Sequence, residues 1–405
     1  MPLLVEAKGA AAMRAGDETG STSAQPAGKH SYDVAVVGAG IVGLAHALAA
    51  ARRGKRVIVV DRDQQANGAS IRNFGFITVT GQQRGQCWHR AIRSRDVWLE
   101  IGERAGIGIV HSGLCLAARR PEARRVLEAF LATDMGTDCR LLSPADAASY
   151  VPGLRRSSLN AVLWSPHERR VESRTAIPRL ARWLEEALGV TFLRSALVKA
   201  VEPPRIETTR GTLLAETAIV CPGHDFQSLF ADRIGAYGLT TCKLHMMRLA
   251  PADPNFRLGA AVMSDLGLVR YLGYSELPEA AALRDRLVEE QKAALDNGVH
   301  MIAVQSSDGS LIVGDSHHYG DTLDPFAPEA VDQLILDEFD AVLDIPGRAV
   351  RERWVGVYAS GGDRLMLVDK PSDSVRIVIV TSGTGASTAF AIGEEVIAEL
   401  FGSQH

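Results

Sequence analysis

The sequence predicts an α/β protein in which a doubly wound, mostly parallel sheet carries an inserted α+β domain built on an antiparallel sheet. Three observations support this fold class. Residues 32–61 read as strand, tight turn, helix and strand. Residues 375–400 read as a buried strand, a second glycine-rich turn and a closing helix. Between them, residues 239–345 hold short alternating segments interrupted by two helical stretches, which is typical of a separate sheet-based domain.

Residues 32–61 carry a G-x-G-x-x-G turn, formed by Gly38, Gly40 and Gly43, directly after an apolar strand. The first glycine permits the sharp turn, the second lets the backbone approach a pyrophosphate, and the third lets helix pack on strand. Asp61 ends the second strand, where a carboxylate can accept the hydroxyls of a ribose. We therefore predict a Rossmann-like dinucleotide site for FAD or NAD rather than NADP; the alternative is a glycine-rich turn without a ligand.

Hydrophobic periodicity and turn signals predict the remaining elements. Helices are expected at residues 86–106, 121–135, 173–188, 278–297, 328–343 and 387–400, and a helix start at Ser143 and Pro144. Strands are expected at residues 76–80, 190–201, 217–220, 243–249, 267–272, 300–305, 310–313 and 375–381, with a strand pair around residues 205–213.

A second glycine-rich turn, at residues 382–386 (SGTGA), helps to distinguish a flavoprotein from an NAD dehydrogenase. An NAD dehydrogenase has no particular need for it. In a doubly wound flavoprotein, the last strand returns to the sheet and the following helix N-terminus meets the edge of the flavin, where its dipole stabilises negative charge on the reduced ring. The pair of turns therefore favours FAD.

Composition excludes several classes of protein. The chain has 405 residues, 46% of them hydrophobic, and a net charge of −4, which gives no argument for nucleic acid. Five widely spaced cysteines suit reduced thiols in a cytoplasm better than disulfides or a zinc site, and no apolar run is long enough to span a membrane. Residues 1–30 resemble no signal peptide, and we expect a disordered tail or an extension from an upstream start codon.

Over residues 32–400, the chain resembles the superfamily of D-amino-acid oxidase, glycine oxidase and sarcosine oxidase, which are FAD-dependent amine oxidoreductases. The resemblance is carried by VVGAGIVGLAHALAAARRGKRVIVVD, GASIRNFG, TAIVCPG, RWVGVYASGGDRLMLVD and TSGTGASTAFAIGEEV. It implies a discontinuous FAD-binding domain at residues 31–80, 155–230 and 354–405, and a substrate domain at residues 81–154 and 231–353 that covers the flavin. The FAD contacts that it implies are Gly38, Gly40, Ile41, Val42, Gly43, Asp61, Arg62, Ser70, Arg72, Asn73, Val198, Gly223, Gly383, Gly385, Ala386 and Ser387.

Further motifs resemble one branch, the FAD oxidoreductases associated with bacterial phosphonate breakdown, which act on 2-aminoethylphosphonate or its N-methyl form. They are ASIRNFGFI, LWSPHERRVESR, TCKLHMMR, IVGDSHHYG and RWVGVYA. Glycine oxidases grip the substrate carboxylate with the Arg of a G-L-R-P motif, and here Tyr358 stands at that place. Sarcosine oxidases attach flavin covalently through a Cys of this segment; no Cys follows Cys242, so we expect FAD to be bound non-covalently.

Amine oxidation on a flavin requires that the amine lose its proton and that its carbon lie at reacting distance from the flavin. For aminoethylphosphonate, hydrolysis of the imine gives phosphonoacetaldehyde with ammonia, or methylamine from the N-methyl form. The phosphonate requires cationic donors, of which Arg binds it in a bidentate manner. The candidates for the anion are Arg72, His245, Arg270, His317, His318 and Arg353, and those for catalysis are Arg72, Lys243, His245, His317 and Tyr358.

Each candidate has an alternative. Arg72 and Lys243 are either at the flavin or on the surface, and Arg353 either binds substrate or pairs with a nearby acid. His245 and Arg270 are expected on strands of the inserted domain. His317 and His318 are neighbours on an extended segment and point to opposite sides, so at most one faces a given site, and we predict no metal there.

Three rival functions remain at this point: a sarcosine, glycine or D-amino acid oxidase or dehydrogenase; an RNA-modification flavoprotein; and a non-catalytic flavin-binding subunit. The second should show a basic surface, which a sequence pI near 6.3 does not favour. The sequence does not distinguish O₂ from another electron acceptor and leaves the oligomeric state open.

Overall fold

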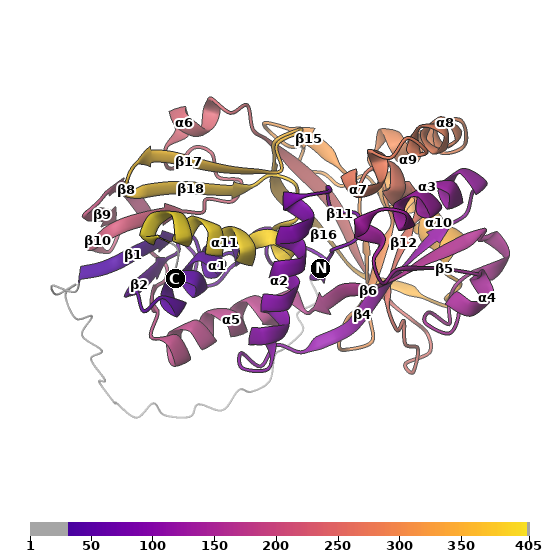
Figure 1. The fold of residues 1–405 in the computed structure, drawn as a ribbon, viewed down its shortest axis with the longest axis horizontal. Helices are drawn as coiled ribbons and strands as arrows, with labels where there is room; N and C mark the ends of the chain where they lie inside the picture. Colours follow the sequence, from indigo (N-terminus) through magenta and orange to yellow (C-terminus); the bar gives the residue numbers. More distant parts are fainter. Residues whose placement is uncertain (1–30, 403–405) are drawn as a thin grey trace, which may run out of the picture.

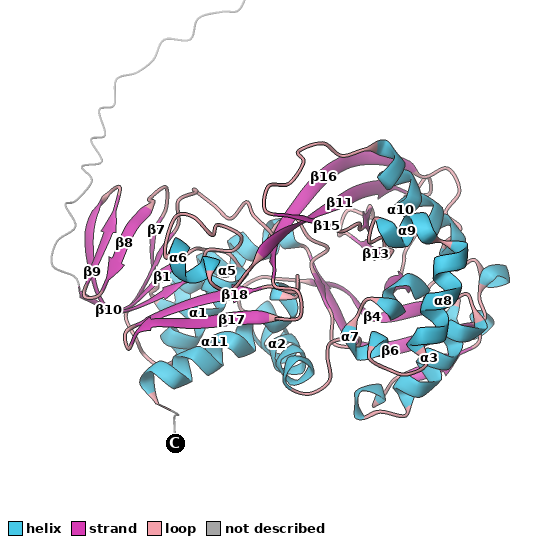
Figure 2. Cartoon of the chain, turned by 90° about the horizontal axis from the view of Figure 1, so that it is seen from above, coloured by secondary structure: helices cyan, strands magenta, loops and turns pink. Residues whose placement is uncertain are grey.

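The computed structural model describes residues 31–402, and the tail predicted at residues 1–30 lies outside this range. Two sheets lie side by side along the long axis of the molecule, each with helices of its own (Figure 1). Seen from above, the two halves join where β11 and β16 run towards β18 (Figure 2). Within this range, no helix combines the length and the apolar character that crossing a bilayer demands.

The first sheet has the strand order β17-β18-β10-β1-β2-β7, with β9 beside β10 and β8 beside β9. The five strands from β18 to β7 are parallel, which confirms the doubly wound prediction. The strands are β1 (Ser31–Val37), β2 (Val57–Val60), β7 (Thr191–Leu193), β8 (Val198–Glu202), β9 (Arg205–Thr208), β10 (Gly211–Val220), β17 (Met366–Ser372) and β18 (Val375–Val380).

Alternate residues of these strands enter two separate cores, as strand geometry requires. Val34 and Val59 pack on one face with the helices, whereas Ala35 and Ile58 pack on the other face with the β8–β10 layer. Since both faces are covered, the strands read as continuous apolar runs. The helices are α1 (Ile41–Arg52), α2 (Gln86–Gly102), α5 (Ser173–Leu188) and α11 (Gly385–Phe401), with α6 (Ala231–Gly235) near the other layer.

The second sheet has the order β15-β11-β14-β13-β12-β4-β6-β3, with β16 beside β11 and β5 beside β6. Its pairs are antiparallel except for β12 with β4. The strands are β3 (Phe76–Ile77), β4 (Ile109–Ala118), β5 (Arg140–Leu142), β6 (Ala161–Val171), β11 (Thr240–Ala250), β12 (Ala261–Ser264), β13 (Ile302–Gln305), β14 (Leu311–Gly314), β15 (His318–Gly320) and β16 (Ala349–Ser360).

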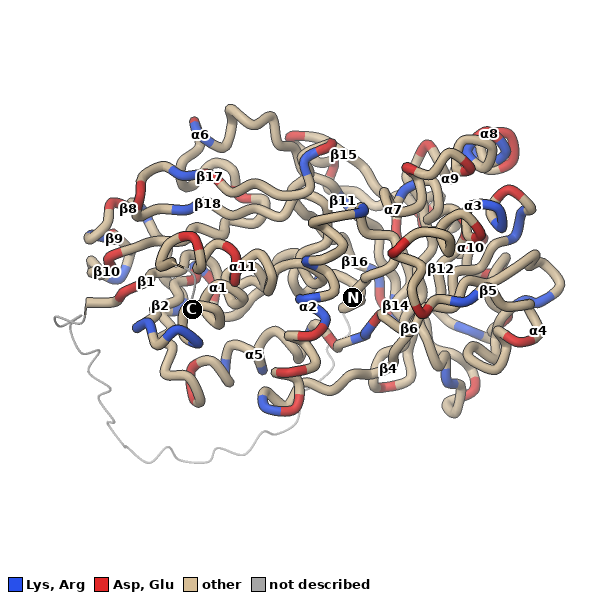
Figure 3. The backbone as a smooth tube through the Cα atoms, viewed as in Figure 1, with Lys and Arg blue, Asp and Glu red and all other residues tan. Residues whose placement is uncertain are grey.

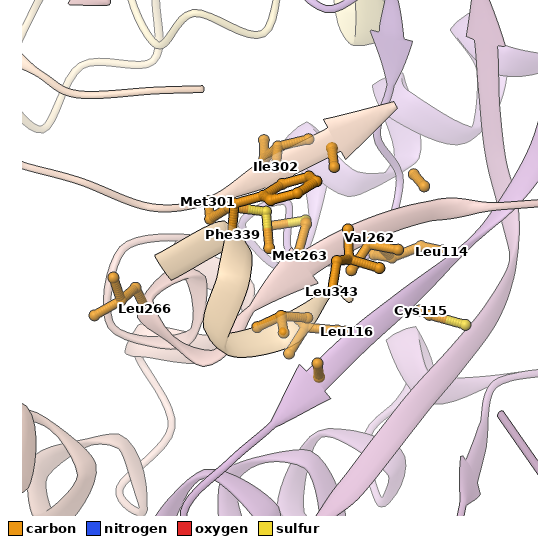
Figure 4. Packing of buried hydrophobic residues seen from close by; sticks show 14 of the residues in the cluster. Leu114, Cys115, Leu116, Val262, Met263, Leu266, Met301, Ile302, Phe339 and Leu343 are labelled. Carbon is orange, nitrogen blue, oxygen red and sulfur yellow. The ribbon is translucent and has the colours of Figure 1, made fainter. Parts of the chain in front are cut away.

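Helices close the outer face of the second sheet. Phe339 of α10 packs with Met263 of β12 and Met301, and Leu343 packs beside Val262, all of them buried (Figure 4). The helices are α3 (Pro121–Leu131), α4 (Pro144–Ala147), α7 (Leu272–Ser275), α8 (Ala280–Glu290), α9 (Lys292–Asp296) and α10 (Glu329–Val342), with 3₁₀ turns η1 (Asp134–Gly136), η2 (Arg156–Ser158) and η3 (Asp265–Val269). This outer layer leaves the opposite face of the sheet to the first domain.

Four segments pack with the other domain than the predicted boundaries assign them to. β3, β6 and the whole of β16 belong to the second sheet, although residues 76–80, 161–171 and 354–360 were assigned to the FAD-binding domain. Helix α2 was assigned to the substrate domain, but its Val97 and Trp98 lie in the core of the first. Ion pairs between α2 and α11, such as Arg90–Glu395 at 2.7 Å, hold it there.

Charges of both signs are interspersed along both halves of the chain (Figure 3). Many of them form exposed ion pairs, for example Arg93–Glu394 and Arg124–Glu128. Each such pair contributes little stability in water. The exposed charges therefore add little to the stability of either domain.

Several predicted elements are shorter or of another kind. The strand expected at residues 267–272 is the turn η3 followed by α7, so Arg270 does not lie on a strand. The strand expected at residues 190–201 is divided into β7 and β8, because Ser195 adopts a left-handed conformation (φ 53°). Residues 211–220 form one strand rather than two. The helix start is confirmed, since the Ser143 side chain accepts a hydrogen bond from the Asp146 N–H.

Candidate active site

A cavity of about 410 Å³ lies between the two sheets. The first domain lines it with the turn before α1, the loop after β2 and the N-terminus of α11. The second domain closes it with side chains from the β14–β15 segment, from β16 and from the turn after η3. Of the predicted FAD contacts, those that line it are Gly40, Ile41, Val42, Gly43, Ser70, Arg72, Asn73, Gly223, Gly383, Gly385, Ala386 and Ser387.

The turn before α1 has no room for side chains. Gly38 adopts φ 104°, and a Cβ there would lie 2.4 Å from the carbonyl oxygen of Cys221. A Cβ on Gly43 would lie 1.8 Å from the Gly38 oxygen. Beside them, the Ser70 hydroxyl accepts a hydrogen bond from the Ile41 N–H at 2.9 Å. Bare backbone and a helix N-terminus thus face the cavity, which is the arrangement that binds a pyrophosphate.

Asp61 organises this turn from the end of β2. Its Oδ2 accepts a hydrogen bond from the Ala39 N–H at 2.6 Å, and its Oδ1 accepts one from the Asp63 N–H at 2.8 Å. Asp61, Arg62 and Val198 do not line the cavity itself. Arg62 pairs with Asp225, and the Val198 side chain lies in the core. A contact of these three residues with the adenosine half of FAD stays a prediction.

The second glycine-rich turn faces the same cavity, as predicted from its position after the last parallel strand. Gly383 adopts φ 72°, and a Cβ there would lie 3.3 Å from the ring of Tyr358. The Ser387 hydroxyl accepts a hydrogen bond from the Thr78 N–H at 2.9 Å. Helix α11 therefore begins directly at the cavity wall, with Tyr358 of β16 opposite its first turn.

The second domain contributes the polar wall. Arg270 donates a hydrogen bond from Nη2 to the hydroxyl of Tyr319 at 3.0 Å. The rings of His317 and Tyr358 meet edge to face at 6.4 Å. Burial raises the pKa of the Tyr358 hydroxyl well above its usual value, so it stays protonated. Among the predicted substrate residues, the structure thus brings Arg72, Arg270, His317 and Tyr358 together at this cavity.

Strand β11 places two other candidates elsewhere. Leu244 faces the cavity, whereas Lys243 and His245 point to the other side of the sheet, into a separate small pocket. The Lys243 ammonium donates hydrogen bonds to the carbonyl oxygens of Asp324 and Phe326 at 2.7 and 2.8 Å. The prediction of Lys243 at the flavin is therefore wrong in this structure, because the strand alternates sides at each residue.

His245 and Arg353 share one buried acid, Asp332. Asp332 Oδ1 lies 2.8 Å from His245 Nδ1, and its Oδ2 accepts a hydrogen bond from Arg353 Nε at 2.9 Å. His318 lines the same small pocket as His245. These three candidates therefore do not reach the cavity. The expected divergence of His317 and His318 is confirmed, since only His317 lines the cavity.

Sequence reasoning missed Tyr271, His300 and Asp315, which all line the cavity. Asp315 precedes the predicted His317–His318 pair by two residues, and period-2 alternation places it on the same side as His317. That signal was available in the sequence. His300 and Tyr271 come from other segments of the second domain, and only the fold brings them there.

Comparison with known proteins agrees with this architecture. The family model of the DAO group, described as FAD dependent oxidoreductase, matches residues 33–400. The chain belongs to this family of FAD-dependent oxidoreductases. Glycine oxidase from Geobacillus kaustophilus is 27% identical over 224 residues, which cover 51% of this chain and 57% of that protein, so the match spans little more than half of the relative.

Solved structures of other family members show the same fold. The crystal structure of that glycine oxidase superposes with a TM-score of 0.71 at 20% identity, covering 93% of this chain and 96% of that one. L-proline dehydrogenase from P. horikoshii gives a TM-score of 0.72 at 20% identity, covering 91% and 93%. These values confirm the predicted fold class.

The residues of this family member fit its cofactor, FAD. The tightly packed turn before α1 presents Gly40 and the helix N-terminus to the cavity, where a pyrophosphate would bind, and the α11 N-terminus offers its dipole to the flavin end of the cavity. Cys221 also lines the cavity, but burial raises the pKa of its thiol, which disfavours the nucleophilic thiolate. When bound, FAD supplies the redox chemistry; the chain supplies position, charge and exclusion of water.

Proposed function

We propose that the protein oxidises the C–N bond of a small zwitterionic amine, 2-aminoethylphosphonate or its N-methyl form, with FAD as hydride acceptor. The products are phosphonoacetaldehyde and ammonia, or methylamine from the N-methyl form. Oxidation of glycine, sarcosine or another amino acid is the alternative, which the likeness to glycine oxidase favours. The free state of the described cysteines agrees with a reducing, cytoplasmic location in a bacterium.

The observation that carries this proposal is Arg270. Its guanidinium lies in the cavity wall, and within residues 31–402 it forms no ion pair; its hydrogen bond goes to the Tyr319 hydroxyl. An arginine in a half-buried wall that makes no direct ion pair, although it feels the charge of Asp315, has donors free for an anionic substrate group. Its planar donors suit the oxygens of a phosphonate.

The place of the anion site supports a phosphonate over an α-carboxylate. Tyr358 stands where glycine oxidases have their carboxylate-binding Arg, and its neutral hydroxyl supplies no charge there. The cation instead comes from the turn after η3, on another element of the second domain. An anion site on a different element is what we expect for a substrate whose anionic group is not an α-carboxylate.

In the mechanism that follows, Arg270 and Tyr319 bind the anionic tail and thereby orient the chain of the substrate. Burial of Tyr271 and Tyr358 against the cavity keeps water from the reacting carbon. FAD, held by the turn before α1 and the α11 N-terminus, would supply the hydride acceptor, and hydrolysis of the imine product would give aldehyde and amine. The side chains therefore contribute mainly by positioning.

Anaerobic reduction of the purified yellow protein tests the proposal. The protein is mixed with 2-aminoethylphosphonate, its N-methyl form, glycine or sarcosine, and bleaching of the flavin band is followed. We expect fast bleaching by a phosphonate alone. Bleaching by glycine or sarcosine alone would refute the phosphonate assignment, and no bleaching by any of them would refute amine oxidation. Readmitting O₂ separates oxidase from dehydrogenase, and acid precipitation, which releases non-covalent FAD, tests the mode of attachment.

A further inference from the structure

Three buried acceptor groups converge on one point of the cavity wall: the Asp315 carboxylate and the imidazoles of His300 and His317. Asp315 Oδ1 lies 3.0 Å from His300 Nδ1, and Asp315 Oδ2 lies 3.8 Å from His317 Nε2. The three side chains are at most 6% exposed. We call these three residues the amine tripod.

The backbone holds the tripod in place. His300 and Asp315 exchange a pair of backbone hydrogen bonds at 3.1 Å, just beyond the ladder of β13 with β14. The His317 N–H donates to the carbonyl oxygen of Asn297 at 2.9 Å. These bonds fix the direction of the three side chains into the cavity.

The inward nitrogen of His317 is an acceptor. Its Nδ1 lies 2.8 Å from the carbonyl oxygen of Gly298, and a carbonyl can only accept, so Nδ1 carries the proton. Burial lowers the pKa of His317 well below its ordinary value, and the ring is therefore neutral. Its Nε2 then presents a lone pair towards Asp315.

The other two groups of the tripod each have one atom without a hydrogen-bond partner, while His300 Nε2 lies 3.4 Å from the Tyr271 hydroxyl. His300 Nδ1 and Asp315 Oδ1 are both buried and unsatisfied, although they lie 3.0 Å apart. Burial also lowers the pKa of His300 well below its ordinary value, so this ring is neutral as well. Buried polar groups are normally paired. When His300 carries its proton on Nε2, towards the Tyr271 hydroxyl, its Nδ1 is an acceptor beside Asp315 and His317, and a small cation with several donors satisfies all three.

We propose that the amine tripod binds the ammonium group of the substrate and that Asp315 takes its proton. This deepens the proposed function, since it rests on amine oxidation but applies to any primary or secondary amine. A primary ammonium donates its three N–H bonds to Asp315, His300 and His317, and a secondary ammonium donates its two to Asp315 and one of the histidines. One N–H bond breaks, the proton passes to an Asp315 oxygen, and its electron pair stays on nitrogen. The product is a neutral amine beside a neutral carboxylic acid.

The neutral amine is the form that can react, because its lone pair drives loss of hydride from the adjacent carbon. Arg270 lies near enough to act on the charge of Asp315 and is the positive end of the same wall. Ammonium at the tripod and anion at Arg270 together fit a zwitterion. The tripod would therefore fix the position of the amine, and Arg270 would select the length of the tail that carries the anion.

The electrostatics of Asp315 suit this task. Burial raises its pKa to about 8, with Arg270 opposing the shift, so the carboxylate that accepts the proton is favoured above that pH and by a bound ammonium, whose charge lowers the pKa. An acid with that pKa accepts a proton from an ammonium far better than an ordinary carboxylate does. The titratable and charged groups that face Asp315 from the surrounding elements are Arg270, Tyr271, His300, His317, Cys242 and Tyr358.

The test is the pH profile of flavin reduction in the FAD-loaded protein with Asp315→Asn. Whichever amine of the substrate panel bleaches the wild type is used, between pH 6 and 10. We expect the variant to be reduced about 100-fold or more slowly at pH 7, as loss of a general base predicts. Its rate should recover towards the wild type as pH rises, because free amine then enters without needing a base. The midpoint should shift upward by at least one pH unit.

The control is Asp321→Asn, an exposed acid a few residues further along the chain, which should keep the wild-type profile. FAD content and the unfolding midpoint, measured for both variants, separate a folding defect from a lost proton acceptor. A loss in Asp315→Asn that is equal at all pH values would overturn the proposal, and so would an unchanged profile.

Two further outcomes are decisive. The same three groups can bind a divalent cation, and the structure gathers their ligand atoms within 4.8 Å. Inactivation of the wild type by EDTA with recovery on Zn²⁺ would make the tripod a metal site and overturn its role for the amine. Reduction by glycine but not by phosphonates, together with the shifted profile, would refute the phosphonate and uphold the tripod. If no amine reduces the wild type, both proposals fail.

Discussion

Replacing Arg270 by Met should weaken phosphonate turnover selectively. The side chain keeps most of its apolar bulk but loses the guanidinium that lies in the cavity wall and bonds to Tyr319. A hydrogen bond to a charged group contributes about 1.5–3 kcal/mol. Since about 1.4 kcal/mol corresponds to a factor of ten, kcat/KM for 2-aminoethylphosphonate should fall by roughly 10- to 150-fold.

The assay is anaerobic flavin reduction over a range of substrate concentrations, with propylamine as a tail without charge. The loss for propylamine should be small, because it makes no anionic contact. Arg72→Met is the comparison variant, since Arg72 lines the same cavity from the first domain and lies 3.4 Å from the Asn67 side chain. Equal losses for both amines in Arg270→Met, or a larger loss in Arg72→Met, would refute Arg270 as the anion site.

Three other changes have defined outcomes. Gly43→Ala would bring a Cβ to 1.8 Å from the Gly38 carbonyl oxygen in the turn before α1, so the purified protein should lose FAD absorbance. Gly108→Ala, where nothing lies within 4 Å of the new Cβ, should retain it. Equal FAD content in the two variants would contradict the role of this turn. Burial lowers the pKa of His46 to about 4 from 6.5, and the stability that this neutral ring permits is lost as pH falls through that window. His46→Leu should therefore remove about 2 kcal/mol of the acid-induced loss in unfolding free energy at pH 5; parallel wild-type and variant curves in urea would contradict this. Asp265→Ala removes the fully buried acid 2.8 Å from Arg120 and leaves this arginine only the more exposed Glu290, 2.7 Å away, so folding should be destabilised by about 3 kcal/mol in denaturant titration; a loss below about 1 kcal/mol would show that Glu290 and solvent replace the buried acid.

The first domain could be predicted because its signals are local. The turn at Gly38, Gly40 and Gly43 and the carboxylate of Asp61 lie within thirty residues of one another, and the backbone geometry that they require is intrinsic to the turn. The second glycine-rich turn follows the last parallel strand, so its place at the same sheet edge follows from strand direction. Sequence spacing alone therefore located the cofactor cavity.

The direction of side chains on β11 could not be predicted in the same way. Nine of its eleven residues, from Thr241 to Leu249, are buried, so no polar and apolar alternation reveals which side faces the cavity. Lys243 and His245 could face either side, and the partners that satisfy them, Asp324 and Asp332, lie some eighty residues later. Arg270 was correctly predicted to be near the substrate cavity but was placed on a strand. The short, mostly apolar run at residues 267–272 does not distinguish a strand from tight helical turns.

The amine tripod shows why chemistry is harder to read than cofactor binding. A flavin is held largely by backbone, and backbone geometry leaves a glycine signature. A substrate amine is held by single side chains, and His300, Asp315 and His317 come from two segments joined through the β13–β14 pair. In a sequence, each is an unremarkable polar residue beside an apolar strand. Their role becomes visible only in the fold, where one carboxylate and two neutral imidazoles meet in one buried wall and unsatisfied polar atoms remain between them. Those atoms specify the charge and the hydrogen bonds of a ligand that could bind there.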